Sequence, residues 1–385
     1  MSLYSVFINV VPYVCLLLVI VLVHELGHFL VGRWCGVKVD AFSLGFGPEI
    51  AHYVDRKGTR WRLAALPLGG YVKFHGDANG ASAPDAEGLS AMPTAERAVT
   101  LHGQNVWRRI AIVAAGPAAN MIFAFVVFAS LFHFNGRVVV RPEVMTVVAG
   151  GPAENAGFQK KDIIKSVDGT PIESFEDMQR ILLLSDGAPL NVVVDRAGTP
   201  VTLTPLPLPH TQQTPFGPMR TMMIGVQAPN VAGAMWMQTY GWAESSRMAV
   251  SEISFRIQTI LHFFKGLAVG TASTDELSGP IRIAQVTGIL AQEGLIPLVY
   301  LAGVLSVSIG FLNLLPIPML DGGYLMFFAF EVIRGKELPK RAQEVGYRIG
   351  LTVVASLMIF VAYNDIARTY QSIVQARATQ TTTNK

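Results

Sequence analysis

The spacing H-E-x-x-H at His24, Glu25 and His28 is the feature of this sequence most able to do chemistry. Residues four positions apart in a helix lie on one face, so both imidazoles can reach a single metal ion. Zinc lowers the pKa of a bound water to about 7, and the carboxylate between the histidines can accept the proton as the water attacks a carbonyl. The spacing therefore predicts one zinc ion with His24 and His28 as ligands and Glu25 as the general base.

The run Val19–Leu30, which contains this pattern, is otherwise strongly apolar. A charged or strongly polar residue near the centre of a bilayer costs roughly 2.5–3.5 kcal/mol on insertion scales. A metal site offsets this cost for all three residues at once. One alternative is that they line a water cavity or proton path, as in a polytopic transporter. A second is a membrane scaffold with a degenerate metal site, against which the intact Glu25 and histidines argue.

A catalytic zinc usually has three protein ligands, so a further ligand is expected from another apolar segment. Asp321 follows Asn313-Leu-Leu-Pro316-Ile-Pro318-Met-Leu and precedes two glycines, in a stretch that is otherwise apolar. Prolines and glycines free backbone groups from helical bonding, and such backbone at membrane depth must be buried in protein or line a cavity. We expect Asp321 to be the third ligand, and Asn313, Pro316 and Pro318 to contact substrate. The alternative is that the prolines only kink a helix and Asn313 bonds internally.

The composition is that of a membrane protein, because 51% of the 385 residues are hydrophobic and only 15% are charged. Soluble domains carry about 25% charged residues. Charge-free stretches at Tyr4–Val23, Ile110–Phe134 and Leu295–Leu320 approach or exceed the roughly 20 residues that a helix needs to cross a bilayer. A shorter fourth stretch, Ile349–Tyr363, spans only with snorkelling or local thinning. We predict four transmembrane helices.

Basic residues are concentrated in the loop between the first two spans and in the loop after the third. The positive-inside rule makes both loops cytoplasmic, and the segment Gly136–Glu293 extracytoplasmic. His24 and His28 lie late in a helix that runs inward, and Asp321 lies late in another, so the site is expected toward the cytoplasmic side. The formal net charge of +3, without a compact basic patch, gives no indication of nucleic-acid binding.

The regions between the spans differ in character. Ala41–Phe74 alternates apolar and polar residues around glycines, which predicts a β-region. Gly76–Glu96 is rich in small residues and Pro, typical of a mobile insert. Val138–Val226 reads as an independent α+β domain with a helix at Phe175–Leu184. A following apolar stripe, from Ile253 to Phe264, predicts an amphipathic helix at the membrane interface or, alternatively, one packed on that domain.

These features predict a polytopic α-helical membrane protein with a β-region between its first two spans and one extracytoplasmic α+β domain. Its predicted segments are 1–35 (first transmembrane helix), 36–105 (β-region and insert), 106–135 (second helix), 136–228 (α+β domain), 229–293 (amphipathic segment), 294–332 (third helix) and 333–385 (cytoplasmic loop, fourth helix and tail).

With both metal motifs in place, the chain resembles the site-2 protease family of intramembrane zinc metalloproteases, most closely the bacterial RseP type. His24–Phe29 resembles the first motif of that family, and Asn313–Gly323 resembles its N-x-x-P-x-P-x-L-D-G-G motif. Further similar segments are Gly45–Pro48, Pro67–Phe74, Ala115–Asn120, Leu277–Ile281 and Asn364–Ile366.

The resemblance implies that His24, His28 and Asp321 bind zinc, that Glu25 is the base and that Asn313 contacts substrate. It also implies that Ala41–Phe74 forms a membrane-associated β-region near the active site. Pro152–Gly157 and the residues after it look like a PDZ domain, which in this family can bind peptides or C-termini; tandem pairs occur there, but only one is found here. It also implies a place in the bacterial inner membrane, with the PDZ domain periplasmic. The implied substrates are single-pass membrane proteins already cut on the outer side, such as anti-sigma factors or signal-peptide remnants, in regulated intramembrane proteolysis.

Overall fold

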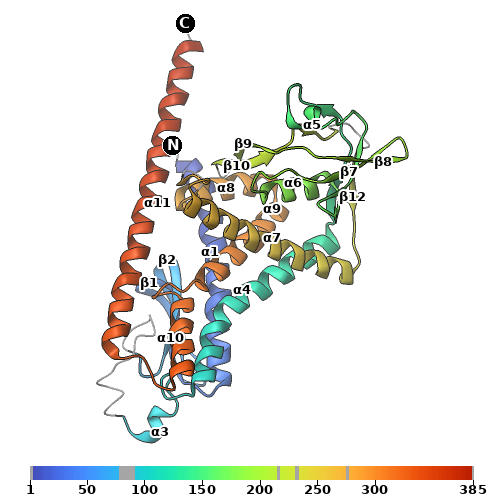
Figure 1. Ribbon diagram of the computed structural model, residues 1–385. Helices are drawn as coiled ribbons and strands as arrows, with labels where there is room; N and C mark the ends of the chain where they lie inside the picture. The colour runs from blue at the N-terminus through green and yellow to red at the C-terminus, as the bar shows by residue number, and fades with distance from the viewer. Residues whose placement is uncertain (1–2, 78–91, 215–216, 230–233, 275–276, 384–385) are drawn as a thin grey trace. The chain divides into compact units, whose positions relative to one another are not determined.

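The computed structural model describes residues 3–77, 92–214, 217–229, 234–274 and 277–383. The chain divides into two compact units (Figure 1). One comprises Met1–Val127 and Gly279–Lys385, and the other comprises Phe128–Ser278. The expected mobile insert, Gly76–Glu96, falls mostly outside the described residues; within its described part, the short helix α3 (Thr94–Arg97) begins before the insert ends.

Four helices of the described chain are long and apolar enough to cross a membrane, in agreement with the predicted number. Their candidate spans are Phe7–Trp34 in α1 (Leu3–Trp34), Val106–Phe134 as α4, Leu295–Asn313 as α9 and Arg341–Thr369 in α11 (Lys340–Thr383). The fourth is longer than the sequence stretch predicted, because the helix continues beyond it at both ends.

The third apolar stretch is not one continuous helix. Helix α9 ends at Asn313, and α10 (Asp321–Arg334) begins at the aspartate. Pro316 and Pro318 account for the break, since proline lacks an N–H and disfavours helical backbone at the residue before it. Seven residues without helical structure therefore separate two helices, and they place Asp321 at a helix start.

Small residues let α1 and α4 pack closely. A Cβ atom on Gly27 of α1 would lie 2.2 Å from the backbone oxygen of Ala115 in α4. Such close approach is how membrane helices gain packing energy without a hydrophobic driving force. The interface therefore requires glycine at position 27.

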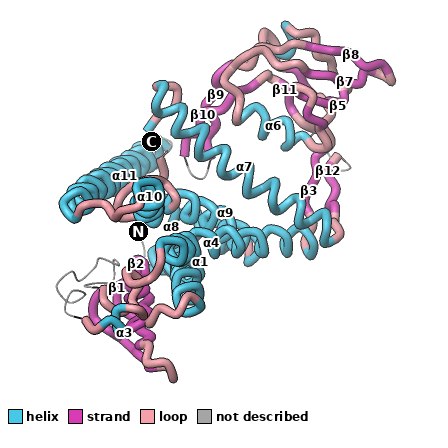
Figure 2. Tube along the Cα trace, turned by 60° about the horizontal axis from the view of Figure 1, so that its bottom comes forward, coloured by secondary structure: helices cyan, strands magenta, loops and turns pink. Residues whose placement is uncertain are grey.

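The predicted β-region is a twisted antiparallel hairpin of β1 (Val39–Val54) and β2 (Arg60–Phe74), which lies beside α1 (Figure 2). Phe42 and Phe74 are buried against Phe29 of α1 and Ile112 of α4. Gly45, at φ +87°, lies so close to Leu66 that any side chain would clash with its backbone oxygen. The buried half of the hairpin thereby reaches the helices that carry the metal motifs.

Helix α8 (Pro280–Glu293) belongs to the same unit and packs on α1. Gly288 of α8 faces Asn9 of α1 so closely that a Cβ atom would lie 1.8 Å from the amide oxygen. The start of α8 is capped by Asp365 of α11, whose buried carboxylate accepts hydrogen bonds from the backbone N–H groups of Gly279 (3.1 Å) and Ile281 (3.0 Å). The predicted segment 229–293 thus divides between the two units.

The second unit contains an α+β domain, as the sequence predicted. Its main sheet has the order β6-β5-β7-β8, all antiparallel, with helix α6 beside it. The elements are β5 (Ile163–Val167), β6 (Thr170–Pro171), α6 (Phe175–Leu183), β7 (Val192–Arg196), β8 (Thr199–Leu203) and the short helix α5 (Pro152–Asn155). Ser174 and Asp177 form a capping box at α6, and Phe175 and Met178 join Ile164 and Val192 in the core.

Three further strand pairs belong to this unit: β3 (Arg137–Val140) with β12 (Met235–Gln238), β4 (Thr146–Val147) with β11 (Val226–Gln227), and β9 (Leu208–Thr214) with β10 (Gly217–Met223). The amphipathic helix α7 (Trp242–Val269) follows them. Glu252 of this helix is buried and bonds Arg180 of α6 at 2.6 Å. Helix α7 therefore packs on the α+β domain, while Leu261 and Phe264 stay exposed.

Candidate metal centre and active site

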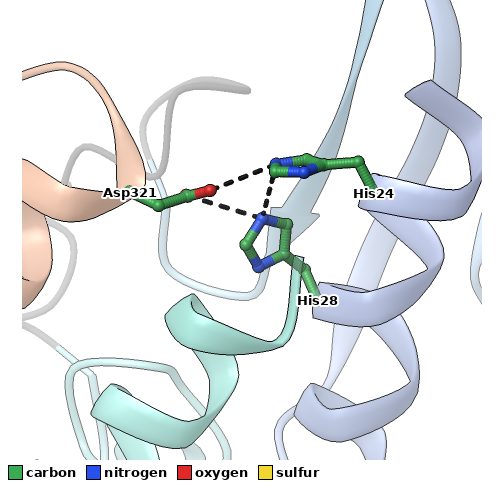
Figure 3. Close-up of side chains that lie close together, drawn as sticks. All are labelled: His24, His28 and Asp321. Carbon is green, nitrogen blue, oxygen red and sulfur yellow. Dashed lines mark hydrogen bonds and ion pairs between the residues drawn. The ribbon is translucent and has the colours of Figure 1, made fainter. Parts of the chain in front are cut away.

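His24 and His28 lie one turn apart on the same face of α1, as their spacing predicted. Their Nε2 atoms are 3.3 Å apart and point toward a common position (Figure 3). The Nδ1 atom of His28 lies 2.9 Å from the backbone oxygen of Ile112 in α4, which can only accept a hydrogen bond. The proton of His28 therefore lies on Nδ1, and its Nε2 lone pair is available to a metal.

Asp321, which is distant in sequence, lies close to both histidines. Its Oδ2 atom is 3.1 Å from Nε2 of His24, and its Oδ1 atom is 3.5 Å from Nε2 of His28 (Figure 3). The three side chains form the only group of three or more potential metal-binding residues found in the described part of the chain. The structure thus brings together the three residues that the sequence assigned to the metal.

The bend between α9 and α10 places Asp321 beside His24 and His28. A Cβ atom on Gly322 would lie 2.2 Å from the backbone oxygen of Leu315, and one on Gly323 would lie 2.5 Å from that of Ile317. Only glycines let the proline-containing segment fold back over the first turn of α10. An ion pair between the buried Arg109 of α4 and Glu331 of α10 fixes the same helix farther along.

The donor set and its spacing fit zinc. A tetrahedral zinc with ligands at about 2.0–2.1 Å separates neighbouring ligand atoms by roughly 3.3–3.4 Å. The three separations here, 3.3, 3.1 and 3.5 Å, lie close to that value. Two imidazole nitrogens and one carboxylate are a common protein set for catalytic zinc, and they leave a fourth position open.

Gly116 of α4 keeps space beside the two imidazoles. A Cβ atom at this position would lie 2.3 Å from Nε2 of His28 and 2.9 Å from Nε2 of His24. Any side chain would therefore occupy the space where the two nitrogens converge. The sequence assigned no role to this residue. From sequence alone, a glycine within an apolar span is equally consistent with close helix packing as with a role at a metal centre.

Glu25 lies next to the cluster, where α1 meets the hairpin. Gly70 of β2 comes so close that a Cβ atom there would lie 3.1 Å from Cγ of Glu25. The side chain is only partly exposed, as expected for a carboxylate in a site with restricted water access. Strand β2 therefore runs beside the residue to which the sequence assigned proton transfer.

Asn313 is the last residue of α9, and its side chain makes no hydrogen bond to any described residue. The alternative in which it bonds internally thus finds no support. Pro316 is exposed, whereas Pro318 packs against α11, where a Cβ atom on Gly350 would lie 2.0 Å from its backbone oxygen. Pro318 therefore fixes the bend. Of the three residues expected to contact substrate, Asn313 and Pro316 are the ones with surface free for such a contact.

A model of peptidase family M50 matches residues 12–357. The chain belongs to this family. A protein of Agrobacterium fabrum described as a zinc metalloprotease is 44% identical over 93% of this chain and 95% of its own length. A Brucella suis protein of the same description is 42% identical over 93% and 95%. The metalloprotease MmpA of Caulobacter vibrioides is 37% identical over 94% and 96%.

Membership of family M50 confirms the resemblance to the site-2 proteases. This protein is a zinc-dependent intramembrane metalloprotease, a bacterial multi-pass membrane protein that acts on membrane-protein substrates. The transporter alternative finds no support in these comparisons.

Proposed function

We propose that His24, His28 and Asp321 hold the catalytic zinc and that Glu25 is the general base for hydrolysis of peptide bonds within transmembrane segments. One observation carries this assignment: three donor atoms from two distant apolar segments converge to within 3.1–3.5 Å of one another. Such a group at membrane depth is costly unless something compensates it.

The chain's own groups have distinct tasks in this reaction. When bound, zinc supplies Lewis acidity that polarises a carbonyl and makes water a nucleophile near neutral pH. The Glu25 carboxylate accepts the proton of the attacking water and delivers it to the amine that leaves. His24 and His28, fixed on one helical face, and Asp321, fixed by the glycine bend, keep the reacting atoms in one geometry. Gly116 keeps the approach to them open.

A transmembrane substrate must be unwound before it can be cut, because a helix hides its carbonyls in hydrogen bonds. We assign this task to the β1–β2 hairpin, to Asn313 and to Pro316. Within the hairpin, residues 41–44 pair on one side with residues 70–73 and on the other with residues 60–63, so among the described strands the segment 70–73 keeps an edge on which an extended peptide can pair. The unbonded Asn313 amide can hold such a peptide by its backbone, and Pro318 keeps the segment in place.

The α+β domain is assigned as a single PDZ domain. Its sheet, its capped helix α6 and the motif Pro152–Gly157 support this assignment. A PDZ domain takes up extended peptides or C-termini by adding a strand to its sheet. The positive-inside rule places it outside the cytoplasm, which in the inner membrane of a bacterium is the periplasm. It would there meet single-pass proteins already trimmed on their outer side, such as anti-sigma factors or signal-peptide remnants.

The test is cleavage of a single-pass transmembrane protein by the full-length enzyme in lipid vesicles, combined with zinc analysis. The wild-type protein should carry one zinc and lose activity with a chelator. Glu25→Gln should keep its zinc and lose about 10²–10⁴-fold in cleavage rate. Near-normal cleavage by Glu25→Gln would remove Glu25 from the role of base. Retention of zinc by a His24→Ala, His28→Ala double variant would refute the metal assignment.

A further inference from the structure

Asn120 of α4 is a fully buried polar residue beside the metal centre. Its Nδ2 atom lies 3.4 Å from Nδ1 of His24. Its Oδ1 atom is buried and has no hydrogen-bond partner among the described residues. The backbone oxygen of Asn120, separate from its amide, accepts a hydrogen bond of 3.0 Å from the hydroxyl of Ser306 in α9.

The chemistry of His24 specifies what must face its Nδ1 atom. His24 turns Nε2 toward His28 and Asp321, and an imidazole that gives this lone pair to a metal carries its proton on Nδ1. That N–H needs an acceptor, and an amide nitrogen cannot accept. A half-turn of the Asn120 amide about its Cβ–Cγ bond exchanges nitrogen and oxygen. Only the turned orientation gives the contact one donor and one acceptor.

His28 already shows the same arrangement with a main-chain acceptor. Its Nδ1 atom lies 2.9 Å from the backbone oxygen of Ile112. Ile112, Gly116 and Asn120 follow one another at intervals of four residues, so they lie along one stripe of α4. The stripe faces α1. Ile112 offers an acceptor to His28, Gly116 leaves space for the two Nε2 atoms, and Asn120 places its amide at His24.

We propose that the side-chain oxygen of Asn120 accepts the Nδ1–H of His24 and thereby fixes the tautomer and ring orientation in which Nε2 is free for zinc. Asn120 is then a positioning residue of the metal centre, and α4 supplies the outer hydrogen-bond acceptor of both histidines. This inference rests on the proposed role of His24 as a zinc ligand. A purely structural Asn120 would instead contribute through packing alone.

The test compares two substitutions that differ in hydrogen-bonding capacity. Asn120→Asp keeps an acceptor and loses the amide donors, whereas Asn120→Leu has similar size and neither. Zinc affinity is measured on the purified full-length protein in detergent, by competition with a chromophoric chelator. Asn120→Leu should weaken zinc binding about 10–100-fold. Asn120→Asp should bind zinc nearly as tightly as the wild type.

Ser306→Ala is the matched control, because it removes the bond to the backbone of Asn120 and leaves the amide untouched. It should keep wild-type zinc affinity. If Asn120→Leu does not fold, Asn120→Ala provides the same contrast with Asn120→Asp. Equal weakening of zinc binding by Asn120→Asp and Asn120→Leu would show that the amide donors of Asn120 matter. Wild-type zinc affinity in Asn120→Leu would show that Asn120 contributes through packing alone. Either result overturns the proposal. Unchanged zinc affinity in His24→Ala would instead refute the proposed ligand set.

Discussion

The Oδ2 atom of Asp321 lies 3.1 Å from Nε2 of His24, although one residue begins α10 and the other lies in α1. No local rule of secondary structure makes these two residues meet. The meeting depends on the bend after α9, on the glycines that let it close and on the ion pair that fixes α10 to α4. It is therefore the contact on which the metal assignment can be tested most directly.

Replacement of Asp321 by alanine should reduce zinc affinity and abolish cleavage together, since two histidines alone leave a catalytic zinc one protein ligand short. Zinc content after dialysis against a weak chelator measures the first effect, and cleavage of a transmembrane substrate measures the second. Glu337→Gln, a change at an exposed carboxylate, is the control and should alter neither. Full zinc occupancy in Asp321→Ala would transfer the ligand role to another residue.

Replacement of Asn313 by alanine should impair substrate handling and leave zinc in place. A single hydrogen bond to a substrate backbone contributes about 0.5–1.5 kcal/mol, which corresponds to a loss of roughly twofold to twelvefold in kcat/KM. Leu312→Ala, the preceding position on α9, controls for loss of side-chain volume. Loss of metal in Asn313→Ala would mean that the residue supports the metal centre rather than the substrate.

The sequence predicted those residues of the site that a motif or a break in a helix indicates. His24, Glu25 and His28 follow from helical periodicity, and Asp321 follows from the need for a ligand at a helix break. Gly116 could not be assigned in this way. Its importance depends on α4 packing against α1, and a glycine in an apolar helix otherwise predicts only close packing.

In the fold, too, features that depend on contacts between distant segments could not be predicted from the sequence. The four apolar helices and the strands around Ile164 and Val192 could be predicted from composition and alternation. The β9–β10 hairpin could not, since Leu208–Thr214 is rich in polar residues and carries no apolar alternation. Glu252 precedes the apolar stripe that runs from Ile253 to Phe264, and nothing in the local sequence indicates that it is buried. It is buried because Arg180, distant in sequence, lies opposite it.

Removal of the Asp365 carboxylate should loosen the start of α8. This buried group accepts hydrogen bonds from three backbone N–H groups, those of Gly279, Ile281 and Arg282. Because hydrogen bonds to a charged group contribute about 1.5–3 kcal/mol, Asp365→Ala should lower the apparent melting temperature of the protein. Hydrogen exchange in the first turn of α8 should also become faster.

Ile366→Ala is the control for Asp365→Ala, because Ile366 is the next residue of α11 and is 60% exposed. It should leave both measurements near the wild-type values. Unchanged exchange in α8 of Asp365→Ala would show that the helix start is fixed by its packing on α1 instead.

The ion pair between the buried Asp162 and the partly exposed Arg196 should make the stability of the α+β domain depend on pH in the acidic range. Burial by itself would raise the pKa of Asp162, but the Arg196 guanidinium, at 2.8 Å from each carboxylate oxygen, and the Gln159 N–H hold it below its ordinary value near 3.8. A lowered folded-state pKa stabilises the domain above the ordinary value, and this stabilisation is lost as the pH falls through the folded-state pKa.

Hydrogen exchange of β5 and β7 in the full-length protein tests this dependence. Protection in the wild type should decline as the pH falls below about 4, the range in which an unfolded aspartate binds its proton. Asp162→Asn should lower protection already at pH 6, by about 1–3 kcal/mol, since it leaves Arg196 without its charged partner, and should show a flatter decline in acid. Asp195→Asn, at a half-exposed carboxylate 3.8 Å from Lys165, is the matched control and should behave as the wild type. A parallel acid decline in the wild type and Asp162→Asn would assign the pH dependence to other groups.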